Sequence, residues 1–520
     1  MANSAGKISA VMAGGVAVAA ALTLMCFGTL AAVIWRADGS GLGPADLAAI
    51  KFTVLQAATS ALVSVALAIP VARALARRQF IGRSVLIILL GAPFLVPVIV
   101  AVMGLLQVFG RSGVVNTGLA AIGLPAISVY GFHGVVLANV FFNLPLAVRM
   151  VLQGWQAVPA ERFRLAAALG FAPTDILRHL ERPMLREVLP GAAVVIFTLC
   201  LSSFAVALTL GGGPRATTVE LAIYQALRFD FDLGRAAALA AVQFTLCAGA
   251  ALLSLRLANA ASFGTGLDRT PALWPVLSPA TDLQDMVAIS LSALFLLLPL
   301  TAMVLRGVPG LADLPSSVWP ALARSVTVAT ASTILTMTAT VILALAIVRG
   351  QDTKFLELAS ILPLAASSLV LGTGLFLIVQ PWIAVAKLAL PVTALVNATL
   401  ALPFAVRIIL PALRSTEADY GRLASSLNLT GIAKWRLLIL PRLRPQLGFA
   451  AGLVAALSMG DLGVVALFAS EAGVTLPLLV QRLMGAYRMD AAAGVALVLI
   501  STSFAAFWLL DREGRRHADA

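Results

Sequence analysis

The segment "RLAAALGFAPTDILRHLERP" (Arg164–Pro183) interrupts a chain that otherwise consists largely of apolar runs. It is rich in arginine, carries a glycine near its middle and has long apolar stretches on both sides. A similar segment, "RLASSLNLTGIAKWRLLILP", returns at Arg422–Pro441, 258 positions further on. The shared register of these two polar segments and the apolar runs around them decide the fold.

The composition places the chain among membrane proteins. Of its 520 residues 60% are hydrophobic and only 11% are charged, with a mean hydropathy of +1.00. A soluble domain rarely buries so much apolar surface. The net charge of +13 suggests nucleic acid in a soluble protein. In a membrane protein it has another source, because Lys and Arg collect in cytoplasmic loops, and we expect no nucleic-acid partner.

The apolar runs predict an all-α polytopic membrane protein with about twelve transmembrane helices. A run of roughly 20 apolar residues crosses the ~30 Å hydrocarbon core of a bilayer. The first run is longer than the roughly 7–15 residues of a signal-peptide core, so we expect it to be a retained helix. The runs are 11–35, 52–72, 84–109, 128–151, 190–210, 236–255, 284–305, 325–348, 356–380, 388–410, 446–469 and 491–510.

The distribution of positive charge orients these helices. With the N-terminus inside, most of the 36 Lys and Arg fall on the side that also holds the C-terminus. The positive-inside rule then places both termini in the cytoplasm. On this topology each polar segment is a cytoplasmic loop between the fourth and fifth helix of a six-helix half.

The register of 258 positions extends beyond the polar segments. The same shift aligns "LPLAVR" (Leu144–Arg149) with "LPFAVR" (Leu402–Arg407), and "LSSFAVAL" (Leu201–Leu208) with "MGDLGVVA" (Met459–Ala466). Shared apolar composition does not explain a constant register across some sixty residues. The chain therefore contains an internal duplication, which is common in transporters whose two halves enclose a path.

Upstream of that region the register changes. "PFLVPVIVAVMG" (Pro93–Gly104) matches "PLAASSLVLGTG" (Pro363–Gly374) at a shift of 270, so the first half carries about twelve extra residues. Both halves have the same number of runs and the same sidedness, which predicts a parallel repeat. We expect a first repeat at 1–258, a cytoplasmic linker at 259–283 and a second repeat at 284–520.

The first polar segment has the pattern of two short helices around a turn. Leu165, Ala166 and Leu169 share one helical face, and Gly170 is suited to a C-cap. Ile176 and Leu177 lie on a second short helix, which we expect Pro183 to end. A single copy leaves two readings open, a docking surface or an amphipathic loop that packs on its own membrane domain. Two copies in one register favour a bivalent docking site.

The segments resemble the cytoplasmic "EAA" loop of permease subunits of ATP-binding-cassette importers. Gly170 and Pro183 match the glycine and proline of that loop, and Pro441 matches in the second copy. The leading Glu of the family is replaced by Arg164 and Arg422.

The second copy also departs from the family at the glycine. Asn428 stands there, and since Asn tolerates the left-handed conformation we expect the same turn. The resemblance implies coupling loops at 161–187 and 417–445. The coupling residues that it implies are Arg164, Leu165, Ala166, Leu169, Gly170, Ile176, Leu177, Pro183, Arg422, Leu423, Ala424, Leu427, Asn428, Trp435 and Pro441.

Along the whole chain the resemblance is to fused membrane subunits of thiamine (and thiamine pyrophosphate) importers. It is strongest at Ser202–Asp232, Leu457–Phe468 and Thr475–Asp490. It implies two type I permease repeats in a bacterial inner membrane, two copies of a cytoplasmic ATPase and a periplasmic solute-binding protein. Iron(III) and aminoethylphosphonate importers use similar permeases, so those substrates stay open as alternatives.

The chain itself lacks the residues for ATP hydrolysis. None of its lysines (7, 51, 354, 387 and 434) lies in a Gly-x-x-x-x-Gly-Lys-Ser/Thr loop. We expect no enzyme activity and no cofactor bound by this chain, with ATP used by the partner subunits. A secondary transporter, the main rival, needs several membrane carboxylates for coupling and no paired docking loops.

A carboxylate within a span marks a candidate path. Asp461 lies about midway along a predicted span, where a charge is costly and indicates function. With Ser202, Ser203 and Phe204 it is predicted to line the path, its charge favouring a cation. The alternative is that Asp461 sits at a helix kink and bonds to neighbouring backbone or hydroxyl groups.

Overall fold

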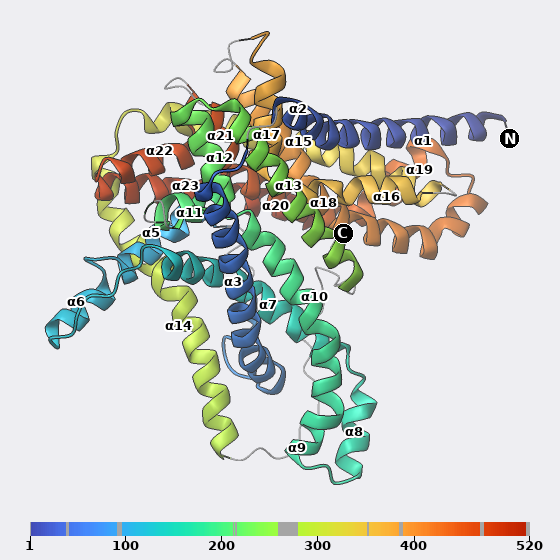
Figure 1. Cartoon of the computed structure of the whole chain (residues 1–520). Coiled ribbons are helices and arrows are strands. Elements are labelled where there is room, and N and C mark those ends of the chain that lie inside the picture. The colour runs from blue at the N-terminus through green and yellow to red at the C-terminus, as the bar shows by residue number, and fades with distance from the viewer. Residues whose placement is uncertain are drawn as a thin grey trace.

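The computed structural model describes residues 2–37, 41–90, 96–211, 213, 216–257, 279–350, 353–383, 388–468 and 473–515. Within these residues the chain is helical and contains no strand (Figure 1). Apolar runs with few breakers produce this result, because in lipid a helix satisfies its own backbone hydrogen bonds.

The first half contains thirteen α-helices among the described residues. They are α1 (Ala2–Thr23), α2 (Thr29–Ala37), α3 (Pro44–Arg77), α4 (Arg83–Leu89), α5 (Val98–Phe109), α6 (Val114–Ala121), α7 (Phe132–Ala157), α8 (Ala160–Ala168), α9 (Pro173–Ile176), α10 (Arg182–Leu201), α11 (Phe204–Leu210), α12 (Val219–Gln225) and α13 (Leu233–Leu257).

The second half contains ten α-helices among the described residues. They are α14 (Pro279–Gly310), α15 (Val318–Arg349), α16 (Lys354–Ile361), α17 (Ser368–Val379), α18 (Ala389–Ser426), α19 (Gly431–Lys434), α20 (Leu440–Met459), α21 (Gly463–Phe468), α22 (Leu476–Gly485) and α23 (Met489–Arg515).

The expected number of spans is confirmed. Eleven helices in the described part of the chain are long and apolar enough to cross a membrane, or up to twelve if one bent pair forms a single span. That pair, Lys354–Ala365 and Ser368–Val379, is bent by 94°. The continuous helix expected at 356–380 is therefore wrong. In the first half the expected run 84–109 likewise divides into α4 and α5.

The linker expected at 259–283 ends earlier than its composition suggested. Residues 258–278 lie outside the described part of the chain, and α14 already begins at Pro279. Pro is well tolerated in the first turn of a helix, because its missing N–H has no intrahelical partner there. The last five residues of the expected linker, 279–283, therefore lie in α14, and the boundary between the linker and the second repeat stays a prediction.

Hydrogen bonds outside the helices repeat between the halves. The first N–H of α12, at Val219, donates to Thr53 Oγ1 on α3 at 2.9 Å. The first N–H of α22, at Leu476, donates to Ser325 Oγ on α15 at 2.9 Å. A short helix in each half is thus anchored at the same place on the corresponding long helix. The duplication that the sequence predicts is a structural repeat.

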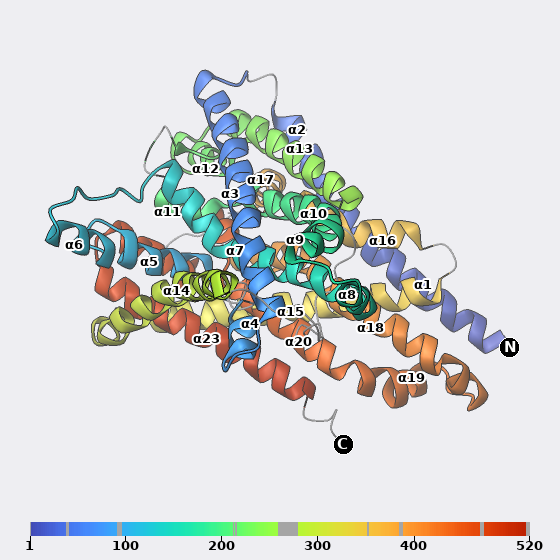
Figure 2. The same ribbon diagram turned by 90° about the horizontal axis from the view of Figure 1, so that it is seen from below.

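The first span of each half packs on the third span of the other half. A Cβ at Gly104 of α5 would lie 2.4 Å from the Pro299 carbonyl oxygen of α14, and a Cβ at Gly374 of α17 would lie 2.4 Å from Thr29 Cβ of α2. Pro299 follows Thr29 by the same 270 positions that separate the two glycines. Figure 2 shows α14 running beside α5 and α23. These two contacts mark the seam between the halves.

Substitution of the seam glycines tests this arrangement. Gly104→Val and Gly374→Val place a side chain against the facing helix, and such overpacking costs about 1–3 kcal/mol. We expect each variant to lower the melting temperature of the purified protein in detergent. Gly118→Val on α6, where nothing lies within 4 Å of an added Cβ, is the control and should unfold like wild type. Equal melting temperatures for all four proteins would contradict the packing.

Candidate functional site

The first coupling loop folds as a helix, a left-handed turn and a second helix. After α8, Gly170 has a φ of +68°. Its N–H donates to the Ala167 carbonyl at 3.1 Å, and the Phe171 N–H donates to the Ala166 carbonyl at 3.0 Å. These two bonds form a Schellman motif, which satisfies carbonyls that would otherwise end the helix without partners.

The second coupling loop contains the same motif. Asn428 has a φ of +52° and its N–H donates to the Ser425 carbonyl at 3.1 Å, while the Leu429 N–H donates to the Ala424 carbonyl at 2.8 Å. The prediction that asparagine takes the left-handed conformation of the family's glycine is confirmed. The geometry of the turn therefore survives the change in sequence.

Each loop presents two exposed leucines. Leu165 and Leu169 are 60% and 62% exposed, and the equivalent Leu423 and Leu427 are 56% and 62% exposed. Large apolar side chains left open at matched positions suit a partner surface. The expectation that Ala166 lies on the same exposed face as these leucines, here called the ridge, is wrong. Like Ala424 in the second loop, it is buried.

Other predicted coupling residues lie beneath or beside the exposed ridge. Ala166 packs with Phe163 and with Ile176, so the inner face of α8 and α9 is a small apolar core of its own. Leu177 and Trp435 are half-buried, and Arg164 and Arg422 are exposed.

Pro183 does not end the second short helix of the first coupling loop. The chain passes from α9 through a π-helical turn at Leu177–Glu181 directly into α10, where Pro183 occupies the first turn. Pro441 has the same place in α20. A π-helical turn lies just before each proline, at Leu177–Glu181 and at Trp435–Ile439, and such a turn accommodates the missing N–H, so each loop joins its long helix without a break.

A buried carboxylate ties the first loop to the membrane helices. Glu181 is paired with Arg73 of α3 at 2.8 Å and with Arg77 at 3.3 Å, and Arg77 also faces Asp285 of α14 at 3.8 Å. The equivalent position in the second half is Ile439, which is fully buried in an apolar cluster. The first loop is thus held by ion pairs and the second by apolar packing. Figure 1 shows α8 and α9 at the lower end of the protein and α19 at its right side.

The predicted path residues lie at equivalent helix breaks. In the first half the helix is interrupted at Ser202 and Ser203 between α10 and α11. Ser202 is exposed and Ser203 is half-buried. Phe204 is only 4% exposed, and its ring packs on Tyr224 with centroids 5.4 Å apart. In the second half the break falls between α20 and α21, at Asp461.

Asp461 lies at a helix kink, as the second of the two interpretations of this residue predicted. Its carboxylate faces the N–H groups of Gly463, Val464 and Val465, where it caps α21, and the side-chain amide of Asn397. The preceding Gly460 abuts the first half, since a Cβ there would lie 3.2 Å from Pro97 Cα. The carboxylate therefore lies close to the seam. Its role in a path stays a prediction.

Next to each helix break, an asparagine of a neighbouring helix takes part in side-chain hydrogen bonds. Asn139 Nδ2 donates to Gln56 Oε1 at 2.7 Å, and Gln56 Nε2 donates to the Cys200 carbonyl at 2.8 Å, next to the first break. Asn397 Nδ2 donates to Ser458 Oγ at 3.1 Å beside the second break. Asn397 follows Asn139 by 258 positions, so the predicted path residues form two equivalent sites rather than one cluster.

The sequence reasoning did not select Gln56, Asn139 or Asn397. A signal was present, because polar side chains within spans face protein or a cavity rather than lipid. Glu220 is also fully buried, on α12, but it lies between two spans, so this signal does not mark it.

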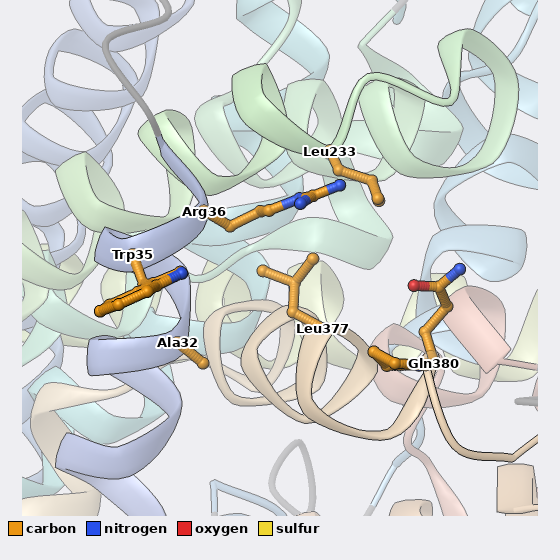
Figure 3. A pocket seen from close by; sticks show the side chains of 7 residues that line it. Ala32, Trp35, Arg36, Leu233, Leu377 and Gln380 are labelled. Atoms are coloured by element: carbon orange, nitrogen blue, oxygen red, sulfur yellow. The ribbon is translucent and has the colours of Figure 1, made fainter.

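A pocket of about 470 Å³ opens at the ends of three helices (Figure 3). It lies between α2 and α13 of the first half and α17 of the second. The Arg36 guanidinium extends over Leu377 in this view. No predicted site residue lines it. The lining residues are Ala32, Trp35, Arg36, Leu233, Leu377, Gln380 and Pro381.

No cluster of metal-binding side chains occurs in the part of the chain that the structure describes. Cys26, Cys200 and Cys247 are buried free thiols. They are core residues.

Known proteins resemble this chain along its whole length. The thiamine transport system permease protein ThiP of Brucella abortus (strain 2308) is 37% identical over 531 aligned positions, which cover 98% of this chain and 96% of the relative. ThiP of Escherichia coli (strain K12) is 39% identical over 479 positions, covering 89% and 88%. The chain belongs to the ThiP permease family.

A more distant relative matches only part of the chain. The molybdenum transport system permease protein ModB of Mycobacterium bovis is 30% identical over 225 residues, which cover 43% of this chain and 82% of ModB. Less than half of this ThiP-family chain therefore corresponds to most of another permease. No family model matches the chain.

Proposed function

We propose that this chain is the membrane subunit of an ATP-driven importer of thiamine or thiamine pyrophosphate. The observation that carries the proposal is its similarity to ThiP proteins over nearly the whole of both chains. A periplasmic binding protein delivers the solute, and two copies of a cytoplasmic ATPase supply the energy. Nothing in these relatives favours iron(III), aminoethylphosphonate or a secondary transporter.

The two coupling loops provide one docking site for each ATPase copy. Each offers two exposed leucines one helical turn apart, next to a capped left-handed turn. Such a ridge suits the groove of a partner protein, because it buries apolar surface without reorganising the loop. The chain binds no ATP itself, and hydrolysis takes place on the partners.

The proposed docking of the ATPase also assigns an orientation to the chain. Both lie on the cytoplasmic side of a bacterial inner membrane, together with both termini, as the distribution of Lys and Arg predicts.

The path runs along the seam, past the two equivalent helix breaks. Ser202 and Ser203 face it from the first half and Asp461 from the second, while Phe204 closes it by packing on Tyr224. A carboxylate beside the path favours a cation, and the thiazolium ring of thiamine carries a permanent positive charge.

Uptake by reconstituted vesicles tests the function. With the ATPase and binding protein present, we expect labelled thiamine to accumulate when ATP is supplied, and no accumulation without ATP or without this chain. Vesicles supplied with labelled iron(III) or aminoethylphosphonate serve as comparisons. ATP-driven uptake of one of those solutes, with none of thiamine, would replace the proposed substrate.

Charge at the exposed leucines tests the docking role. The double variant Leu169→Glu and Leu427→Glu buries two carboxylates in an apolar contact, so we expect co-purification of the ATPase to fall more than tenfold. Ala167→Glu with Ser425→Glu is the control, since both positions are exposed on the far side of the same helices. Normal co-purification with the leucine variant, at normal permease yield, would disprove the docking role.

Removal of the charge at Asp461 tests the path. Asn keeps a side-chain oxygen that caps a helix, so Asp461→Asn should melt like wild type while thiamine uptake falls about tenfold or more. Asp461→Leu, which loses both charge and cap, should also lower the melting temperature. The path role is excluded if Asp461→Asn takes up thiamine with unchanged kinetics.

A further inference from the structure

Glu220 is a buried carboxylic acid for which no partner is visible. Its side chain is 0% exposed at the second position of α12, and within the described residues neither carboxylate oxygen has a hydrogen-bond partner of normal geometry. An unpaired carboxylate in an apolar interior costs several kcal/mol. The cap of α12 does not depend on this acid, because Thr218 Oγ1 accepts from the Leu221 N–H at 3.3 Å.

The polar groups that face Glu220 come from both halves. They are the N–H of Phe204, the first residue of α11, and the hydroxyl of Ser367, the N-cap of α17. Ser367 Oγ accepts from the Val370 N–H at 3.2 Å, which leaves its own proton free to be donated. Since α17 belongs to the second half, the carboxyl lies at the seam.

The electrostatic surroundings of Glu220 are those of a buried acid. Burial raises the pKa of Glu220, which lies between the spans that end at Leu201 and begin at Leu233. The buried Cys247 thiol on α13 lies near the acid, and two arginines, Arg228 and Arg482, act on the neighbouring Tyr224 hydroxyl. The closed site therefore favours the neutral acid, and an entering cation would favour the carboxylate.

Aromatic rings lie next to this acid. Tyr224 is one helical turn further along α12, and its ring meets those of Phe204 at 5.4 Å and Phe229 at 5.8 Å between centroids. A carboxylate beside aromatic faces is the combination that binds aromatic and quaternary cations.

The repeat does not duplicate this acid. When the N-caps Thr218 and Thr475 are aligned, Glu220 corresponds to Pro477. The packing of α22 on its long helix is otherwise equivalent, with the Leu476 N–H bonded to Ser325. The architecture of the short helix thus does not require an acid, and the negative charge is specific to the first half.

We propose that Glu220, Phe204 and Tyr224 form a cation-recognition site at the seam, which holds the thiazolium ring of thiamine when α12 and α17 move apart. This inference rests on the proposed function. In the closed arrangement the site is filled by its own side chains, and Ser367 covers it from the second half. Movement of the halves would then expose the acid to the passing solute.

Glu220→Gln tests the proposal, because it keeps the size of the side chain and removes its charge. In vesicles with the ATPase and binding protein, we expect ATP-driven thiamine uptake to fall at least tenfold. ATP hydrolysis stimulated by the binding protein, and the melting temperature, should stay within twofold and within a few degrees of wild type. Asp313→Asn, a charge removal at an exposed site, is the control and should transport normally.

The possible outcomes distinguish a role of Glu220 in cation recognition from a purely structural role. Unchanged uptake by Glu220→Gln overturns the proposal, as does a parallel loss of hydrolysis and thermal stability, which is expected if Glu220 only fastens the two halves together. If Glu220→Gln does not fold, Tyr224→Leu must show the same loss of uptake with hydrolysis retained, or the site is disproved. Wild-type uptake decides the proposed function separately, because it is measured before any variant is compared.

Discussion

The backbone of a membrane protein has no water to bond to within the hydrocarbon, so each interruption of a helix has to be buried in protein and capped. Three helix starts of this chain meet that requirement at or near the seam. Ser367 accepts from the Val370 N–H at the start of α17, and Asp461 faces the first N–H groups of α21. Thr218 does the same for α12. The capping groups hold irregular backbone where the halves meet.

The repeat preserves geometry and varies charge. The turns at Gly170 and Asn428 and the anchoring of α12 and α22 are equivalent in the two halves. The acids are not. Asp461 corresponds to a serine, Glu220 to a proline and Glu181 to a buried isoleucine. Packing constrains the backbone of both halves alike, whereas a path for one asymmetric solute has no need of two equal sets of charges.

Much of the architecture could be predicted from local sequence. Apolar run length gives the number of spans, and the left-handed turn at Asn428 follows from the conformational tolerance of asparagine. The bend before α17 was missed although it falls at the 3₁₀ turn Leu362–Ala365, where Pro363 is a signal for a kink, because the residues around that turn are as apolar as those of a straight span. The prediction that Pro183 ends a helix was wrong, because a proline is found both after the end of a helix and in the first turn of the next one.

Glu220 shows a different limit of sequence reasoning. In the sequence it follows a glycine-rich stretch and reads as part of an outer loop, whereas in the structure it is fully buried. Its position depends on Thr53, which accepts from Val219, and on Ser367, which lies more than a hundred residues away. A carboxyl group becomes informative only when such distant contacts show that water is excluded from it.

The helix α14 connects the coupling machinery to the seam. Near its start, Asp285 faces Arg77, which also pairs with Glu181 of the first coupling loop. Further along, the Pro299 carbonyl packs on Gly104 of α5, too closely for any side chain between them. Close-packed helices transmit displacement rather than absorb it. In the proposed coupling role, a push on the first loop would therefore reach α5 through a helix of the second half. Because the second loop has Ile439 in place of Glu181, the two loops would transmit force through different contacts.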